Sequence, residues 1–130
     1  MNRRAVGLVG VIVTWWWLRP FRLAVDGRSM SPALLPGDYV IAIRPVSLRR
    51  GDLVVVEHPE RPGFEMVKRL TGLPGDVAAG RLLGANEYWI LGDVPAGSTD
   101  SRSFGPVRAE AVRGVVRLRY WPPERIRVFG

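Results

Sequence analysis

Short runs of apolar and β-branched residues, separated by turn residues, make up most of the chain after residue 20. Gly, Pro and Asp lie between the runs, as in Pro36-Gly37-Asp38 and Arg50-Gly51-Asp52, and these residues favour tight turns. No long amphipathic helix pattern occurs there, and the small, polar residues 94–102 indicate a loop. The pattern therefore predicts an all-β fold, a small antiparallel barrel or sandwich. The predicted strands are residues 21–25, 39–43, 53–57, 66–70, 88–91, 112–120 and 126–129.

The first 20 residues have a different pattern. Residues 5–18 carry no charge and lie between Arg3-Arg4 and Arg19-Pro20. As a helix they would be about 21 Å long, which is shorter than the roughly 30 Å hydrocarbon core of a bilayer. Three structures remain open for them: the apolar part of a signal peptide, a short membrane anchor, and a segment packed on the domain. Consecutive tryptophans at 15–17 are typical of the membrane interface, so we expect residues 1–20 to associate with a membrane. If they do not span it, a cytoplasmic location stays open.

The amino-acid composition excludes several kinds of catalytic and metal-binding site. The 130 residues suffice for about one domain, which we expect to comprise residues 21–130. Cysteine is absent and His58 is the single histidine, which excludes disulfides, thiol catalysis and a zinc site built from several imidazoles. We therefore predict no metal and no cofactor, and we expect His58, in a loop-like stretch, to be exposed and uninvolved.

The formal net charge of +7 comes from arginines that are scattered along the chain. Such a surplus can serve nucleic acid, anionic lipid or no specific partner. Because no nucleic-acid-binding motif accompanies it, we expect no nucleic-acid partner.

Lys68 is the single lysine among 19 basic residues. In the strand predicted at residues 66–70, alternation places it on the core face with Met66 and Leu70, and it places Arg69 on the opposite face, toward solvent or an ion pair. Burial lowers the pKa of a lysine, and a neutral lysine can accept a proton, whereas an arginine stays protonated. Lys68 is therefore a candidate general base. The alternative is an edge-strand lysine whose amine reaches water.

Two further segments contain polar side chains suited to catalysis. Ser29 lies between a predicted strand and Pro32, where the chain must turn, so a backbone N–H beside it is available to a developing oxyanion. Farther along, Asp100 and Arg102 are spaced to pair across a loop, and Ser98 is placed to orient an amine by hydrogen bonding. Each segment alone is also compatible with an ordinary polar turn.

Taken in order, four segments resemble the sequence boxes of the signal peptidase I family. They are SMSPAL at residues 29–34, RGDLVVV at 50–56, KRLTGLPGD at 68–76 and GDVPAGSTDSRSFG at 92–105. Their order and internal spacing match the family from about residue 26 to residue 107, and the apolar N-terminal segment matches as well. The resemblance implies a serine endopeptidase with a Ser–Lys dyad, built on the small coiled antiparallel β-barrel of that family and preceded by a short apolar helix.

The resemblance also implies a role for each candidate residue. Ser29 would attack the scissile carbonyl, and Lys68 would take the proton of its hydroxyl. Ser98 corresponds to the serine that hydrogen-bonds the lysine amine in this family. Asp100 and Arg102 correspond to the pair that supports the site.

A precursor protein is the substrate that the resemblance implies. An extended leader would add to a sheet edge near residues 25–28, and Met30 and Leu34 would line pockets for small side chains. Some relatives have, two residues before the nucleophile, a serine whose hydroxyl helps to bind the oxyanion. This chain has Gly27 there.

The identity of the precursor is a finer expectation. The stretch between Lys68 and Asp93 is too short for the large accessory domain of some signal peptidases. In size and overall pattern the chain is similar to family members proposed to mature nickel-type superoxide dismutase. Three alternatives remain open: a general signal peptidase for exported preproteins, a self-cleaving protease of the repressor type, and a non-catalytic basic β module that binds lipid or protein at a membrane. Residues 1–24 offer the repressor type neither a DNA-binding domain nor a cleavable linker.

Overall fold

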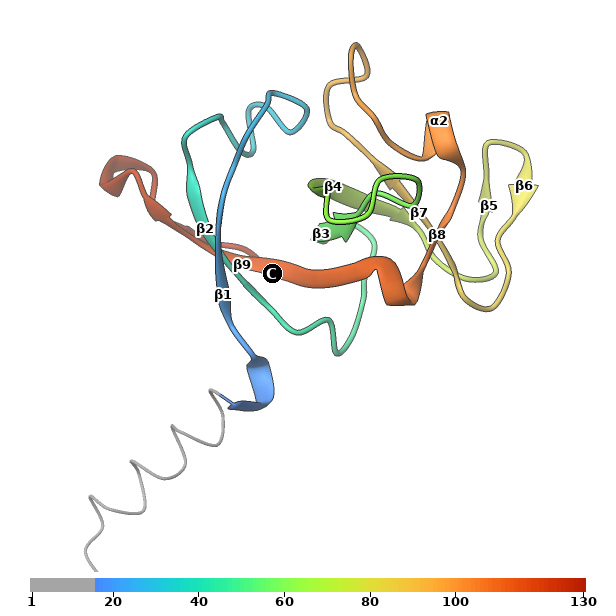
Figure 1. The fold of residues 1–130 in the computed structure, drawn as a ribbon, viewed down its shortest axis with the longest axis horizontal. Coiled ribbons are helices and arrows are strands. Elements are labelled where there is room, and N and C mark those ends of the chain that lie inside the picture. The colour runs from blue at the N-terminus through green and yellow to red at the C-terminus, as the bar shows by residue number, and fades with distance from the viewer. Residues whose placement is uncertain (1–15) are drawn as a thin grey trace, which may run out of the picture.

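The computed structural model describes residues 16–130, and strands dominate this part of the chain (Figure 1). Eight strands form one antiparallel sheet with the order β1-β2-β9-β3-β4-β7-β8, in which β10 also pairs with β9, while β5 and β6 form a separate hairpin. The strands are β1 (Phe21–Ala24), β2 (Tyr39–Ile43), β3 (Leu53–Glu57), β4 (Glu65–Gly72), β5 (Val77–Ala78), β6 (Arg81–Leu82), β7 (Glu87–Leu91), β8 (Val107–Arg108), β9 (Val112–Trp121) and β10 (Arg127–Val128).

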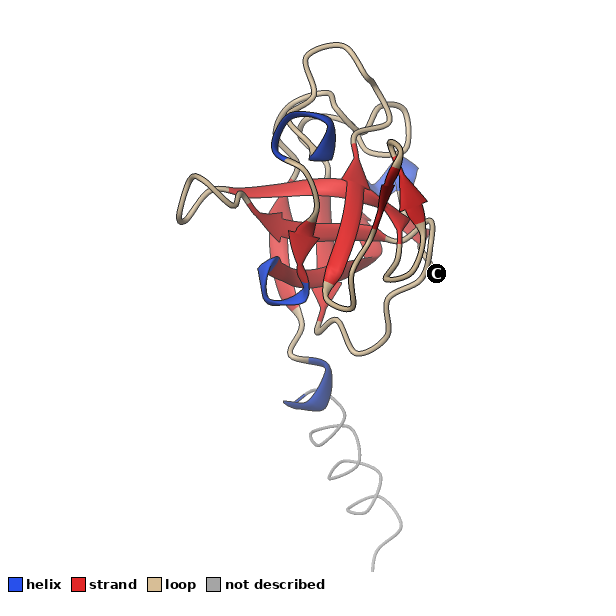
Figure 2. Ribbon diagram, turned by 90° about the vertical axis from the view of Figure 1, so that its right-hand side faces the viewer, coloured by secondary structure: helices blue, strands red, loops and turns tan. Residues whose placement is uncertain are grey.

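The long strand β9 joins the two halves of the sheet. It pairs with β2 over one part of its length and with β3 over another, and the register shifts in both pairings. Such irregularities bend a strand and increase its twist. The sheet therefore curls, and its strands cross one another around a common interior (Figure 2).

Strand β3 shows the effect of this curling on the core. Its alternate residues face two different apolar clusters: Leu53 and Val55 pack in one, and Val54 and Val56 in the other. All four side chains are buried, because both faces of the strand are covered. A strand covered on both faces has a continuous apolar sequence rather than an alternating one.

The structure confirms the predicted all-β fold and all seven predicted strands, with ends that differ by one or two residues. The two-residue strands β5, β6 and β8 were not predicted, whereas β10, which is equally short, lies within the predicted run 126–129. The loop predicted at 94–102 ends in the short helix α2 (Ser101–Phe104), which Asp100 caps by accepting a hydrogen bond from the Arg102 N–H. Two 3₁₀ turns complete the described chain, at Ala109–Ala111 and Pro123–Arg125.

The apolar segment predicted at residues 5–18 lies almost entirely outside the described residues. Within residues 16–130, no helix combines the length and the apolar character needed to cross a membrane. A helical turn at residues 16–18 precedes β1, and the side chains of Trp16 and Trp17 are exposed. The guanidinium of Arg44 lies 4.7 Å from the ring centroid of Trp17.

Candidate active site

A cleft of about 250 Å³ lies between two segments of the chain: the end of β1 with the loop that follows it, and the beginning of β4. Residues 23–30 form one wall and residues 64–68 the other, and Gly97 and Thr99 complete the lining. Ser29 is on the first wall and Lys68 on the second. The fold therefore brings together two residues that are 39 positions apart in the sequence.

The loop after β1 holds Ser29 at this cleft. At its base the Val25 N–H donates to the Asp38 carbonyl at 2.8 Å, and the Gly37 N–H donates to the Val25 carbonyl at 3.0 Å. At its tip the Ser29 carbonyl accepts a hydrogen bond of 2.8 Å from the Val94 N–H. The serine is thus fixed both to its own hairpin and to the loop that follows β7.

A buried ion-pair cluster supports the same loop from the side of the C-terminal segment. The Asp38 carboxylate accepts two hydrogen bonds from the Arg125 guanidinium, at 2.7 and 2.9 Å, and lies 3.6 Å from the Arg119 guanidinium. Arg119 also donates to the Ala33 carbonyl at 2.6 Å. The sequence gives no signal for these three charged residues beyond the place of Asp38 in a Pro-Gly-Asp turn.

Lys68 lies in the interior of the sheet. Strand β4 pairs with β3 and β7, and Lys68 lies opposite Val54. The residue is only 4% exposed, as the alternation in β4 predicts, so its side chain is not one that extends into water. Burial lowers its pKa, the nearby charge of Asp100 acts in the opposite direction, and that of Arg102 lowers it further. The net effect is a lowered pKa, which makes the neutral amine, the form that accepts a proton, easier to reach than for a lysine in water.

Arg69 points to the other face of β4 and forms the ion pair expected there. Its guanidinium donates to both carboxylate oxygens of Asp93, at 2.9 and 2.8 Å, and to the Gly51 carbonyl at 2.9 Å. Because Arg69 follows Lys68 and Asp93 follows Gly92, this pair fixes the lysine strand relative to the loop after β7.

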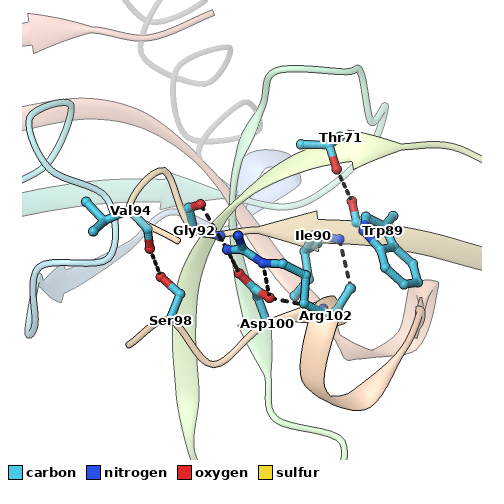
Figure 3. A network of polar contacts seen from close by, with 9 residues as sticks. Thr71, Trp89, Ile90, Gly92, Val94, Ser98, Asp100 and Arg102 are labelled. Atoms are coloured by element: carbon cyan, nitrogen blue, oxygen red, sulfur yellow. Dashed lines mark hydrogen bonds and ion pairs between the residues drawn. The ribbon is translucent and has the colours of Figure 1, made fainter. Parts of the chain in front are cut away.

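Asp100 and Arg102 pair as the sequence predicts, at the centre of a hydrogen-bond network (Figure 3). The fully buried Asp100 carboxylate accepts hydrogen bonds from the backbone N–H groups of Gly92 and Arg102, at 2.9 and 3.0 Å, and from the Arg102 side chain. Burial is the largest influence on the Asp100 pKa and raises it, but these hydrogen bonds together outweigh burial and lower the pKa. Asp100 is therefore a fixed negative charge.

Gly92 is where the two serines of the site meet. A Cβ atom at this position would lie 3.2 Å from the Cβ of Ser29 and 3.0 Å from that of Ser98, and it would overlap the Ser98 hydroxyl. The Ser98 hydroxyl donates to the Val94 carbonyl, as Figure 3 shows. Only a glycine leaves room for both serine side chains, a requirement that the sequence analysis did not recognise.

The predicted pocket residues Met30 and Leu34 lie in different places, and Gly27 has an unusual backbone conformation. Met30 lines the cleft, whereas Leu34 is fully buried in the core and does not reach the cleft. Gly27 lines the cleft and has a φ of +81°, a conformation that costs a serine energy. This backbone conformation gives a physical reason for glycine at that position.

The expectation that His58 is exposed is wrong. The residue is 7% exposed, because its ring packs against Phe64 and Phe104, at centroid distances of 6.1 and 5.0 Å. Its Nδ1 accepts a hydrogen bond from the Glu60 N–H at 3.0 Å, and the residue does not line the cleft. Within residues 16–130, no group of three or more His, Asp or Glu side chains is arranged to hold a metal ion.

A curled β domain with a serine and a buried lysine in one cleft has the architecture of a serine-type peptidase. The chain belongs to the family described as signal peptidase, peptidase S26, which matches residues 3–79 and 77–121. It is therefore a serine-type endopeptidase of the signal peptidase family, whose members cleave leader peptides.

Three relatives show which members are similar. Mitochondrial inner membrane protease subunit 1 of Xenopus tropicalis is 35% identical over 76% of this chain and 68% of its own length. Mitochondrial ATP-independent inner membrane protease subunit 1a of Arabidopsis thaliana is 39% identical over 77% of this chain and 70% of its own length. Mitochondrial inner membrane protease subunit 2 of Mus musculus is 34% identical over 78% of this chain and 67% of its own length.

Proposed function

We propose that this endopeptidase removes an N-terminal leader from precursor proteins, with Ser29 as nucleophile and Lys68 as general base. One observation carries the proposal: Ser29 and the single lysine of the chain line the same cleft, and burial lowers the pKa of that lysine. Neutral lysine is the only strong base among the side chains of this cleft, since its other ionisable groups are carboxylates and an arginine.

Proton transfer in the site follows from this assignment. The neutral Lys68 amine takes the proton of the Ser29 hydroxyl while the oxygen attacks the scissile carbonyl, and the resulting ammonium then protonates the leaving amine. Lys68 next deprotonates the water that hydrolyses the acyl-enzyme and returns the proton to Ser29. Because the Ser98 hydroxyl uses its own proton for Val94, it can only accept a hydrogen bond from Lys68. That bond would leave the amine lone pair directed at Ser29.

The oxyanion is stabilised from the backbone in this proposal. The N–H of Ser29 donates to no acceptor among residues 16–130, so it is available to the developing negative charge. Gly27 adds no hydroxyl, and its positive φ disfavours one. Removing a single oxyanion donor costs an enzyme about 10²–10³ in kcat, so the Ser29 N–H accounts for a substantial part of the rate.

The two walls of the cleft indicate how the leader binds. Each contains strand residues, 23–24 of β1 and 65–68 of β4, so a leader strand between them can hydrogen-bond to exposed backbone while its side chains enter pockets. Met30 closes the cleft beside the nucleophile and selects small side chains there. Leu34, whose N–H donates to the Met30 carbonyl at 2.9 Å, supports Met30 from the core instead of contacting substrate.

Membrane association completes the proposal. The relatives are named as inner membrane proteases. In this chain the apolar residues 5–18 include Trp16 and Trp17, whose side chains are exposed. We assign residues 1–20 to the membrane and residues 21–130 to the catalytic domain. The precursor is a protein whose leader reaches that surface. Nothing in the comparisons singles out a superoxide dismutase precursor, which therefore enters as one substrate among several to be tested.

The test is cleavage of leader-bearing precursors by the full chain and by three variants, read by mass spectrometry. Ser29→Ala, Lys68→Met and Lys68→Arg are each expected to lower cleavage by at least about 10³-fold while the circular dichroism spectrum stays unchanged. A non-catalytic module would show no cleavage by the parent chain. Activity retained by Lys68→Arg would disprove the base assignment, because an arginine does not accept the proton.

The pH profile and the substrate panel refine the result. The acid limb of kcat/KM is expected below the ordinary lysine pKa of 10.5, since burial lowers the pKa of Lys68. A limb that His58→Ala abolishes would contradict this assignment. The panel contains a nickel-type superoxide dismutase precursor and several exported preproteins. Cleavage confined to the first identifies a dedicated maturase, and cleavage of all identifies a general leader peptidase.

A further inference from the structure

A second cavity, of about 490 Å³, lies between the turn that precedes β3 and the C-terminal segment. It shares no lining residue with the catalytic cleft. Asp52 is the single acidic residue of its lining, and its carboxylate already accepts the Arg49 N–H at 2.8 Å. We call this second cavity the arginine cavity, because five arginines line it: Arg49, Arg50, Arg69, Arg117 and Arg127.

Three of these five arginines have no acidic partner. Arg50 pairs with Asp76 and Arg69 pairs with Asp93. The side chains of Arg49, Arg117 and Arg127 form no ion pair with any residue of the described chain, 16–130. Like charges that converge on one cavity repel one another, and an anion in the cavity would remove this repulsion.

The walls of the arginine cavity are held in place before any ligand binds. The Gly51 N–H donates to the Leu70 carbonyl at 2.7 Å, which fastens the turn to β4. The Phe129 N–H donates to the Arg117 carbonyl at 2.8 Å, which fastens the C-terminal segment to β9. The guanidinium of Arg127 lies 5.1 Å from the ring centroid of Phe129. These bonds fix the backbone of the walls, so a ligand would have to order only the arginine side chains.

We infer that the arginine cavity binds the phosphate group of an organic ester that carries a net negative charge. Guanidinium groups match phosphate oxygens with paired, charge-assisted hydrogen bonds, and three of them are uncommitted here. The floor of the cavity is apolar, formed by Leu53, Val116 and Phe129, so it suits the carbon part of an ester better than a bare ion. An anionic phospholipid headgroup and a free phosphate ester both present this chemistry.

The experiment uses the full chain in micelles of a neutral detergent, with three probes that stay in solution. These are dihexanoyl phosphatidylglycerol, glycerol 3-phosphate and dihexanoyl phosphatidylcholine, each titrated by calorimetry at constant ionic strength. The test variant is Arg117→Gln/Arg127→Gln. The matched control is Arg81→Gln/Arg108→Gln, which removes the same two charges from arginines that lie outside the cavity and form only exposed ion pairs.

We expect saturable binding of phosphatidylglycerol to the parent chain. The affinity should fall at least about tenfold in the test variant and less than about twofold in the control variant. If glycerol 3-phosphate binds with the same variant dependence, the site takes free esters; if only the lipid binds, it takes headgroups. Leader cleavage should be unchanged in both variants, so the site is separate from catalysis. Three outcomes would overturn the inference: neither phosphatidylglycerol nor glycerol 3-phosphate binds saturably, both double variants lose affinity by the same factor, or phosphatidylcholine binds as tightly as phosphatidylglycerol.

Discussion

The two walls of the cleft that holds Ser29 and Lys68 are built in opposite ways. Lys68 lies within strand β4, and its position follows from backbone pairing with Val54 of β3 and from the pairing of β4 with β7 that begins at the next residue, Arg69. Ser29 lies on a loop, and its position depends on contacts with residues far away in the chain, such as Val94, and on the cluster around Asp38. The lysine wall is therefore fixed by secondary structure, and the serine wall by tertiary contacts.

This difference determines how each wall fails. A strand inside a sheet keeps its register when one side chain changes, because the backbone bonds remain. A loop held by a few buried polar contacts moves when one of them is lost. We therefore expect mutations near Lys68 to change chemistry without unfolding, and mutations behind Ser29 to change stability and activity together.

The largest effect is expected at the support of the serine wall. Asp38→Asn leaves the guanidinium groups of Arg119 and Arg125 without their acidic partner, and breaking a buried pair costs about 3–5 kcal/mol. Urea denaturation measures the loss, and leader cleavage should fall with it. The control is Asp76→Asn, at an exposed pair with Arg50 that is expected to contribute about 0–1 kcal/mol. Equal losses in the two variants would show that the cluster does not support the loop.

An intermediate effect is expected where the two walls meet. Gly92→Ala adds a Cβ that displaces Ser29 and Ser98, and a shift of about 1 Å in a catalytic group can cost about 10²-fold in rate. We expect kcat to fall by about that factor. Gly84→Ala is the control, because its added Cβ meets only the side chain of Glu87. Unchanged kcat in Gly92→Ala would mean that the serines do not need their observed positions.

The smallest effect, and one of opposite sign, is expected on the lysine wall. Lys68→Met should raise the free energy of unfolding by about 0.5–2 kcal/mol near neutral pH, the usual range for a stabilising substitution. The folded-state pKa of Lys68 is lowered, so the folded protein binds fewer protons than the unfolded chain and wild-type stability rises with pH. The advantage of methionine should therefore shrink as the pH approaches 10.5, the ordinary lysine value. Denaturation at several pH values measures this, and a pH-independent difference would show that Lys68 is not destabilised by its charge.

The local sequence pattern predicted those features of the site that depend on neighbouring residues. Alternation along β4 gave the buried Lys68 and the outward Arg69, since successive side chains of a strand point to opposite faces. A spacing of two residues gave the Asp100–Arg102 pair. The faces of β4 and the Asp100–Arg102 pair both depend on residues that are close in the sequence, so no knowledge of the fold was needed to predict them.

Contacts between distant segments could not be predicted in this way. Asp38 and Arg125 are 87 residues apart, and nothing in either local sequence indicates the other. The burial of His58 was missed for the same reason, because Phe104, one of the rings that cover it, comes from another part of the chain. The need for glycine at position 92 arises only when two loops bring serines to the same Cα atom.

The sequence by itself determined most of the strands, the single lysine and the face on which it lies, because backbone periodicity and side-chain chemistry are local properties. Only the tertiary structure decided that Ser29 lies in the cleft with Lys68, that arginines from β9 and the C-terminal segment hold the serine loop, and that Gly92 makes room for the pair. These outcomes depend on how a curled sheet brings distant segments together, and the free energy of that packing is shared among many residues.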